Sequence, residues 1–275
     1  MRPRWNLPLL LGGGGVAVLL LVGLLAPWLA PHDPMEQDLL AQNLPPFWSA
    51  ARDPAYLLGT DSLGRDLLSR LIWGVRPALL VMLAGTSLSG GVGMLLGLVA
   101  GYLGGWADAL VSRTVEVFMS FPPMLLAIVL AAVIGPGLNT VILAVALIGW
   151  TRFARVMRAE TLKLREQDFV LAARLMAVGG GRILFGEILP NLTPIALALL
   201  SLEMGRAIVV EAVLAFIGFS SSDIPTWGGV VADGRDTFNQ AWWVITSGMA
   251  CILASVLLLN LLGDGLRRAT QRGDE

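Results

Sequence analysis

The chain has 275 residues and nearly balanced charge, with 19 basic and 20 acidic side chains and a formal net charge of -1. Hydrophobic residues make up 56% of it, charged residues only 14%, and the mean hydropathy is +0.74. Soluble domains average about 25% charged residues. The composition therefore predicts an integral membrane protein, and the charge gives no reason to expect a nucleic-acid partner.

Three residue types that occur only once exclude several chemistries. Cys251 is the single cysteine, so no intrachain disulfide can form. His32 is the single histidine, which excludes a two-histidine zinc helix, and its place in a Pro-rich linker argues against a Ser-His-Asp triad. Lys163 is the single lysine and lies in Thr-Leu-Lys-Leu, so no ATP-binding P-loop is present. We expect no catalytic residue, no metal site and no cofactor in this chain.

Six apolar segments are candidates for transmembrane helices, because about 20 apolar residues cross the hydrocarbon core of a bilayer. They are residues 8–29, 77–103, 122–134, 138–153, 192–216 and 243–262. The first is long and lacks a small-residue cleavage site, so we do not expect a removed signal peptide. Backbone groups in lipid have no water to bond, so each span must be a helix, and the predicted fold is all-α.

The distribution of basic residues predicts the direction of the chain. With the N-terminus in the cytoplasm, thirteen of the nineteen basic residues lie inside and five lie outside, with Arg206 within a span. The inside set is Arg2, Arg4, Arg113, Arg152, Arg155, Arg158, Lys163, Arg165, Arg174, Arg182, Arg267, Arg268 and Arg272. The outside set is Arg52, Arg65, Arg70, Arg76 and Arg235. We therefore expect both termini in the cytoplasm.

The expected organisation has four parts. Residues 1–30 form a cytoplasmic tail and the first span, and residues 31–76 form an outer loop. Within this loop, residues 65–76 have apolar side chains at helical spacing, which favours a helix lying at the outer interface, although a helix packed only for structure is an alternative. Residues 77–266 form the five-span core, and residues 267–275 form a cytoplasmic tail.

Glycines recur every fourth residue in the second predicted span, at Gly93, Gly97, Gly101 and Gly105. This spacing keeps them on one helix face, where another backbone can approach closely. General enrichment of glycine in membrane helices is the alternative.

Residues 152–190 form the longest inside loop. Two short helices are expected, over 160–178 and 182–189, with Gly179, Gly180 and Gly181 as the bend between them. The small residues Ala172, Ala173 and Ala177 leave room for another protein to approach. Pro190 suits the first turn of a helix and predicts where the chain re-enters the membrane. The loop is either a docking elbow or a solvated helical loop.

The fifth predicted span carries Glu203, Arg206 and Glu211. Glu203 and Arg206 are three residues apart and can pair. Glu203 lies roughly 18 Å from Asn191 at about 1.5 Å per residue, which places it near the middle of the membrane. These residues, with Ser201 and Met204 nearby, either line a hydrated path, face a partner subunit or connect helices.

Several motifs resemble those of binding-protein-dependent ABC importer permeases. Ala172-Ala173 and Ile188-Leu189-Pro190 are similar to the EAA loop of that family, with Leu171 in place of its glutamate and Ala177 in place of its glycine. Other segments resemble the C-type subunits of the dipeptide, oligopeptide and nickel subfamily. They are LGTD (58–61), LGRD (63–66), SRLI (69–72), GVR (74–76), residues 211–218, Trp227-Gly228 and NLLGDGLR (260–267).

This resemblance implies a MetI-like type I ABC importer permease with six transmembrane helices and a cytoplasmic coupling helix. The implied ATPase-coupling residues are Ala172, Ala173, Arg174, Ala177, Gly179, Gly180, Gly181, Arg182, Leu189 and Pro190. The implied partners are a homologous permease subunit, two ATP-binding subunits that hold ATP and Mg²⁺, and an extracytoplasmic solute-binding protein. The expected location is the cell inner membrane.

The expected cargo is a dipeptide or oligopeptide, and a nickel or metal-chelate importer is the alternative. An ion-coupled secondary transporter using Glu203, Arg206 and Glu211 as a relay is a different class, but such carriers usually show inverted repeats, and this sequence has no convincing one. A membrane scaffold without transport activity is a further alternative.

Overall fold

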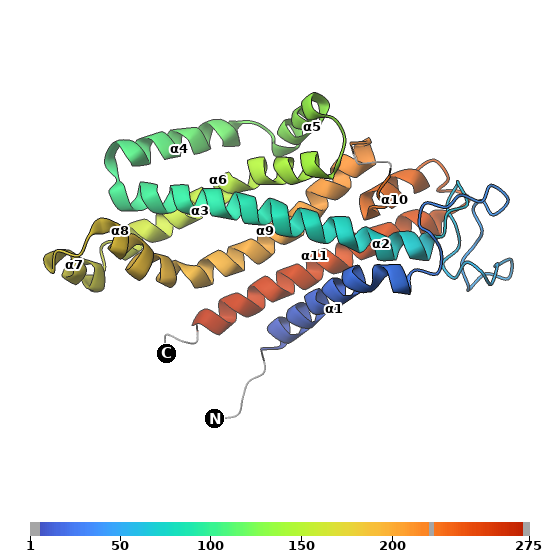
Figure 1. Cartoon of the computed structure of the whole chain (residues 1–275), viewed down its shortest axis with the longest axis horizontal. Helices are drawn as coiled ribbons and strands as arrows, with labels where there is room; N and C mark the ends of the chain where they lie inside the picture. The colour runs from blue at the N-terminus through green and yellow to red at the C-terminus, as the bar shows by residue number, and fades with distance from the viewer. Residues whose placement is uncertain (1–5, 220–222, 272–275) are drawn as a thin grey trace.

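The computed structural model describes residues 6–219 and 223–271, and this part of the chain is helical, with an isolated bridge between Thr60 and Asp66 and no strand among these residues. Long helices run side by side along the longest axis of the molecule (Figure 1). Helix α7 lies at one end and α10 lies near the other, beside the loop of residues 31–66. We refer to these as the α7 end and the α10 end.

Most of the helices are joined by short connections. In chain order they are α1 (Leu7–Leu29), α2 (Leu67–Leu80), α3 (Thr86–Leu103), α4 (Gly105–Ser120), α5 (Pro123–Ile134), α6 (Leu138–Leu164), α7 (Asp168–Leu175), α8 (Gly180–Arg182), α9 (Leu189–Ile217), α10 (Trp227–Gly234) and α11 (Trp242–Gln271). Two π-helical segments, η1 (Val81–Gly85) and η2 (Ile183–Ile188), connect α2 to α3 and α8 to α9.

Within the described residues, five helices are long and apolar enough to cross a membrane, and the bent pair α4–α5 makes a sixth if it counts as one span. The third span was predicted to consist only of residues 122–134, the segment that begins at the two prolines. Instead α4 and α5 meet at an angle of 84°, because Pro122 lacks the N–H that a continuous helix would need. The remaining spans match the expected ones in number and order.

Four spans extend beyond their predicted ends. The second runs from Leu67 to Leu103, the fourth continues to Leu164, the fifth begins at Gly180 and the sixth continues to Ala269. Pro190 was expected in the first turn of a helix, and it is the second residue of α9, although η2 runs into α9 without a break. Proline has no N–H and therefore removes one backbone hydrogen bond from a helix. The π-helical segment η2 changes the hydrogen-bonding pattern just before this position.

Of the two alternatives for the helix over 65–76, the structure shows the one packed into the protein and not a separate interfacial helix. Helix α2 continues through η1 into α3, and its residues Leu67, Leu71 and Val75 belong to the hydrophobic core. Asp66 caps its first turn by accepting a hydrogen bond from the Ser69 amide at 2.8 Å. The charged residues between the apolar ones misled the prediction, because Arg65 and Arg70 are buried with carboxylates rather than exposed.

The glycines of α3 lie against the backbone of α6. A methyl group at Gly93, Gly97 or Gly101 would lie 2.3, 2.4 or 2.8 Å from the carbonyl oxygen of Trp150, Ala154 or Arg158, respectively. The fourth glycine was predicted wrongly: α3 ends at Leu103, and Gly105 begins α4 with φ +56° and no neighbour within 4 Å.

Candidate functional site

The elbow, residues 165–182, protrudes at the α7 end (Figure 1). A single helix over 160–178 was expected, but α6 ends at Leu164 and α7 begins only at Asp168. The bend was expected at Gly179–Gly181, yet it lies at Ala177, whose φ is +56°. Gly179 precedes the next helix and Gly180 and Gly181 lie inside it.

Hydrogen bonds explain why the chain turns at Ala177. The Val178 amide donates to the Ala173 carbonyl at 3.1 Å, and the Ala177 amide donates to the Arg174 carbonyl at 3.0 Å. This pair of bonds is the Schellman arrangement, which requires a left-handed residue just past the helix end. Glycine usually fills that position, and the EAA loop that this segment resembles has a glycine there. The left-handed turn therefore forms in this chain with alanine in place of glycine.

Helix α7 has one buried face and one exposed apolar face. Val170 and Ala173 pack into a cluster with Ile183 and Ile188, so Ala173 does not face outward as expected from its size. Leu175 and Met176 are 89% and 73% exposed. Apolar side chains that are exposed next to each other give this end of α7 a surface on which another protein can pack.

Two contacts and one close approach anchor the elbow to the end of α3. The Arg174 guanidinium lies over the Tyr102 ring, 5.3 Å from its centroid. A methyl group at Gly180 would lie 3.3 Å from the Tyr102 hydroxyl oxygen. Arg165 donates to the Gly101 carbonyl at 3.0 Å. Neither Tyr102 nor Arg165 was identified as a site residue, because nothing in the sequence brings residue 102 near residue 174.

The other predicted coupling residues lie on both sides of this anchor. Ala172, Gly179, Gly181, Arg182 and Pro190 are exposed, whereas Leu189 is partly buried. Ala172, Gly179, Gly181 and Arg182 thus belong to the accessible surface of the elbow.

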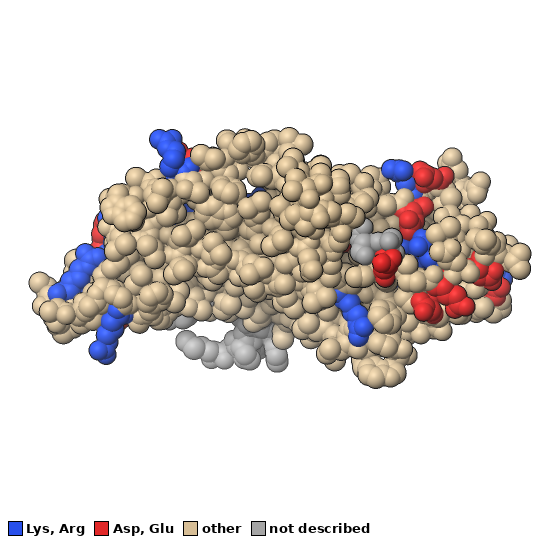
Figure 2. Space-filling model, turned by 45° about the horizontal axis from the view of Figure 1, so that its top comes forward, with Lys and Arg blue, Asp and Glu red and all other residues tan. Residues whose placement is uncertain are grey.

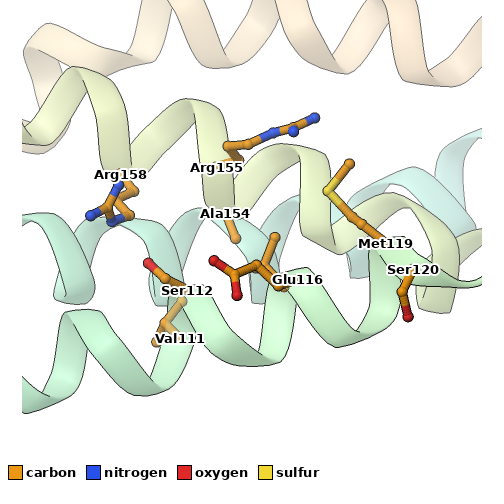
Figure 3. Close-up of a pocket in the computed structure, with 9 residues that line it drawn as sticks. Val111, Ser112, Glu116, Met119, Ser120, Ala154, Arg155 and Arg158 are labelled. Atoms are coloured by element: carbon orange, nitrogen blue, oxygen red, sulfur yellow. The ribbon is translucent and has the colours of Figure 1, made fainter.

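An ion pair connects α4 to α6 near the elbow. Arg158 donates to Asp108 through Nε and, at 2.7 Å, through a terminal nitrogen to Oδ2. A hollow of about 490 Å³ lies beside this pair. Figure 3 shows Ser112, Glu116 and Met119 of α4 on one wall and Arg155 of α6 on the other.

A second charge cluster lies deeper in the bundle. Arg152 of α6 donates to Glu203 Oε2 at 3.0 Å, and Arg206 donates to Glu203 Oε1. The predicted contact between Glu203 and Arg206 is therefore present. Arg152, which was expected in the cytoplasmic loop, instead lies within the continuous helix α6 and reaches Glu203 across 51 positions of sequence.

The remaining predicted path residues are enclosed by this chain. Ser201 lies against α11, where a methyl group at Gly263 would be 2.5 Å from its hydroxyl oxygen. Met204 packs against the main hydrophobic core. Glu211 is buried and hydrogen bonds with Thr226, which caps the first turn of α10. Of the five candidates, Arg206 alone has an exposed side chain.

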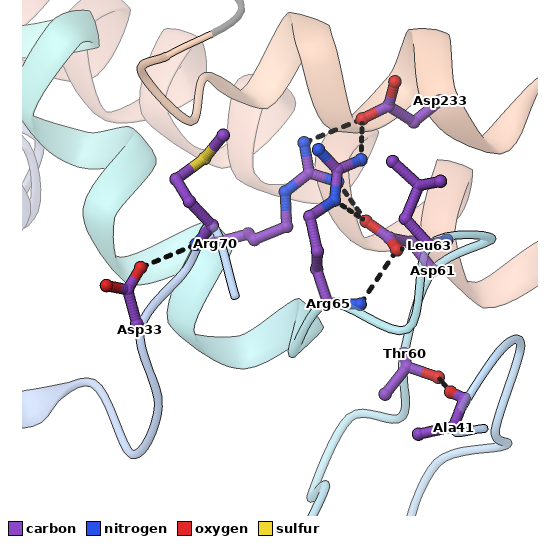
Figure 4. A network of polar contacts seen from close by, with 9 residues as sticks. Asp33, Ala41, Thr60, Asp61, Leu63, Arg65, Arg70 and Asp233 are labelled. Carbon is purple, nitrogen blue, oxygen red and sulfur yellow. Dashed lines mark hydrogen bonds and ion pairs between the residues drawn. The ribbon is translucent and has the colours of Figure 1, made fainter. Parts of the chain in front are cut away.

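The α10 end is held by buried ion pairs (Figure 4). Asp61 accepts from Arg65 Nε at 2.8 Å and also pairs with Arg70. Both arginines also donate to Asp233 of α10 at 2.7 Å. These bonds connect the loop of residues 31–66 to α10 and to the start of α2. Asp61, Arg65 and Arg70 lie in motifs that resemble the family, but the sequence did not predict that they pair.

Charge is distributed unevenly along the molecule. Figure 2 shows Lys and Arg side chains at both ends, most of the visible Asp and Glu near the α10 end, and a surface with few charges between the ends. This distribution suits a protein that crosses a membrane with its long axis across the bilayer.

The arrangement of the helices defines a class: a multi-pass, all-helical membrane protein with a MetI-like fold. A solved structure described as inward-facing conformations of the MetNI methionine ABC transporter matches with a TM-score of 0.62. The match covers 74% of this chain and 97% of the other, at 18% identity.

Sequence comparisons give the family. Residues 93–273 match the family described as binding-protein-dependent transport system inner membrane component, and residues 8–46 match the N-terminal TM domain of oligopeptide transport permease C. The chain belongs to the family of binding-protein-dependent inner membrane permeases.

Two relatives illustrate the similarity. The di/tripeptide transport system permease protein DppC of Pseudomonas aeruginosa is 40% identical over 93% of this chain and 86% of its own length. The dipeptide transport system permease protein DppC of Haemophilus influenzae is 35% identical over 92% of this chain and 86% of its own length.

Proposed function

We propose that this chain is one permease subunit of an ATP-driven importer of dipeptides or short oligopeptides. The relatives at 35–40% identity are named for dipeptide and di/tripeptide transport, and the similarity extends over most of both chains. A homologous permease subunit completes the path, and an external binding protein delivers the peptide. Two ATPase subunits in the cytoplasm bind ATP and Mg²⁺.

The observation that carries this proposal is the elbow. The end of its α7 exposes Leu175, and Met176 directly after it, at the tip of the molecule, while the opposite face of α7 packs into the bundle. A helix that packs into the bundle on one side and binds another protein on the other can transmit a movement of that protein to the bundle. In our proposal the docked protein is an ATPase subunit, and the α7 end and both termini lie in the cytoplasm.

The proposed mechanism is alternating access. ATP binding brings the two ATPases together and draws the elbows of both permeases inward. Arg174, Tyr102 and the α3–α6 glycine contact transmit this movement to the helices of the span. The path then opens at the α10 end beneath the loaded binding protein, and hydrolysis of ATP restores the starting state.

Charged substitutions at the exposed end of α7 test the proposal. Leu175→Asp with Met176→Asp should leave the chain folded in the membrane but abolish co-purification of the ATPase subunits and ATP-driven peptide uptake in proteoliposomes. Leu40→Asp is the control, because Leu40 is even more exposed, at 97%, but lies in the loop at the α10 end. Normal uptake by the double variant, or uphill transport by the purified chain alone, would contradict the proposal.

A further inference from the structure

One face of α9 is exposed along most of its length. Its exposed side chains recur at intervals of three, four or seven residues, which places them in one stripe on the helix. They are Ile195, Leu202, Arg206, Val209 and Phe216. Four of them are apolar, and Arg206 is the single charged residue in the middle of this set.

Arg206 is held in a fixed direction. Its side chain is 56% exposed, whereas the Glu203 side chain that accepts its hydrogen bond is only 5% exposed. Glu203 is itself fixed by Arg152 from α6, at 3.0 Å. Two guanidinium groups share one carboxylate, so the cluster of Arg152, Glu203 and Arg206 carries one net positive charge.

The cluster lies deep in the span. At about 1.5 Å per residue, Glu203 lies roughly 21 Å from the Ile217 end of α9, and Arg152 lies roughly 21 Å from the Leu138 end of α6. An unneutralised positive charge at this depth is costly in lipid and normally faces water or an anion. The stripe therefore faces a hydrated path or an anionic group rather than lipid.

Small hollows lie beside this cluster and along α6 toward the α7 end. The first is lined by Arg152, Glu203 and Arg206 and by Thr86 and Ser89. A second shares Arg152 and Ile148 with the first, and shares Met119 with the hollow of Figure 3. The row passes along α6, from Arg152 to Arg155 and Arg158. Polar groups thus continue from the middle of the span toward the elbow.

We propose that Arg206 binds the C-terminal carboxylate of the peptide during its passage, and that Glu203 and Arg152 orient the Arg206 guanidinium for this contact. This inference rests on the proposed function and adds a specificity-determining residue to it. A guanidinium binds a carboxylate through two parallel hydrogen bonds. The carboxylate is common to all unmodified peptides, so such a contact selects peptides while tolerating their different side chains.

The test uses the complete reconstituted complex, with the binding protein saturated by peptide. Uptake of a dipeptide with a free carboxylate is compared with uptake of the same dipeptide carrying a C-terminal amide. Arg206→Gln should lower uptake of the free acid by about tenfold or more, the effect of losing one charge-assisted hydrogen bond. It should change uptake of the amide less than about twofold. Arg206→Lys should retain part of the preference, and the exposed Arg52→Gln should retain all of it.

Equal losses for both peptides would overturn the proposal. Loss of co-elution of the two permeases in Arg206→Gln would also overturn it, since Arg206 would then pair with a carboxylate of the partner permease. Uptake by the wild-type complex distinguishes failure of the Arg206 proposal from failure of the proposed function. If the wild-type complex takes up neither peptide, the proposed function itself fails.

A second measurement does not depend on amide recognition by the binding protein. A free-acid dipeptide carrying a diazirine is loaded into the complex with hydrolysis-deficient ATPases and crosslinked by light. Labelling within residues 202–209 that decreases in Arg206→Gln supports the proposal. Labelling elsewhere, or labelling unchanged in the variant, overturns it.

Discussion

Gly97 of α3 lies directly against Ala154 of α6, so that a methyl group on Gly97 would be 2.4 Å from the Ala154 carbonyl oxygen. The two helices touch backbone to backbone at Gly93, Gly97 and Gly101. In membranes, such small-residue contacts replace the hydrophobic driving force that associates helices in water. This contact joins the α7 end to the middle of the bundle.

Gly97→Val should separate α3 from α6 and destabilise the fold by about 2 kcal/mol or more, because the backbone of α6 cannot move aside as a side chain would. Thermal unfolding of the detergent-solubilised protein measures the effect. Gly91→Ala is the control: Gly91 is also in α3 but has no neighbour within 4 Å of the added methyl group. Equal stability of Gly97→Val and wild type would show that the two helices are not in contact.

Ala177→Gly should stabilise the elbow. Ala177 has φ +56°, and a left-handed conformation costs a residue with a Cβ about 1 kcal/mol relative to glycine. Slower amide hydrogen exchange in residues 168–178 measures the gain. Ala172→Gly, within α7, should have the opposite effect, since glycine in a helix interior costs about 1 kcal/mol. Faster exchange in Ala177→Gly would contradict the Schellman turn.

Tyr102→Leu should uncouple the elbow from α3, because Arg174 loses the ring on which it lies. In proteoliposomes with all subunits, ATP hydrolysis should continue while peptide uptake falls severalfold. Arg174→Glu and deletion of Gly179–Gly181 should do the same. Tyr102→Phe keeps the ring and should transport normally. Wild-type uptake by Tyr102→Leu would show that the movement passes through other contacts.

Asp61→Asn should destabilise the α10 end severely. It removes one charge from a buried cluster and leaves Arg65 and Arg70 sharing only Asp233. Breaking a buried ion pair on one side typically costs about 3–5 kcal/mol. Limited proteolysis of residues 31–66 and thermal unfolding both measure the loss. Asp236→Asn is the control, because Asp236 and its partner Arg235 are exposed, and it should change stability by less than about 0.5 kcal/mol.

Prediction from sequence worked best where single segments carry the information. The apolar runs of α1, α6 and α11 had to be helical spans whatever packs around them, because lipid offers no partner to their backbone groups. The motifs that resemble the permease family also lie in single segments, and the family they indicated is the one that the comparisons show.

Helix ends were predicted poorly for a physical reason. Arg70 and Arg152 were predicted to lie outside the spans, since charges are costly in lipid. Each of them is paired with a carboxylate far away in sequence, and the pairing allows the helix to continue through the charge.

The sequence by itself determined that this protein is a bundle of membrane-crossing helices of the permease family with an elbow between its fourth and fifth spans. Only the tertiary structure decided where the elbow turns, which of its faces is exposed and which charged residue of α9 remains accessible. Burial of apolar segments is a local property of the chain. The turn at Ala177, the Arg174–Tyr102 contact and the Arg152–Glu203–Arg206 cluster depend on which helices become neighbours.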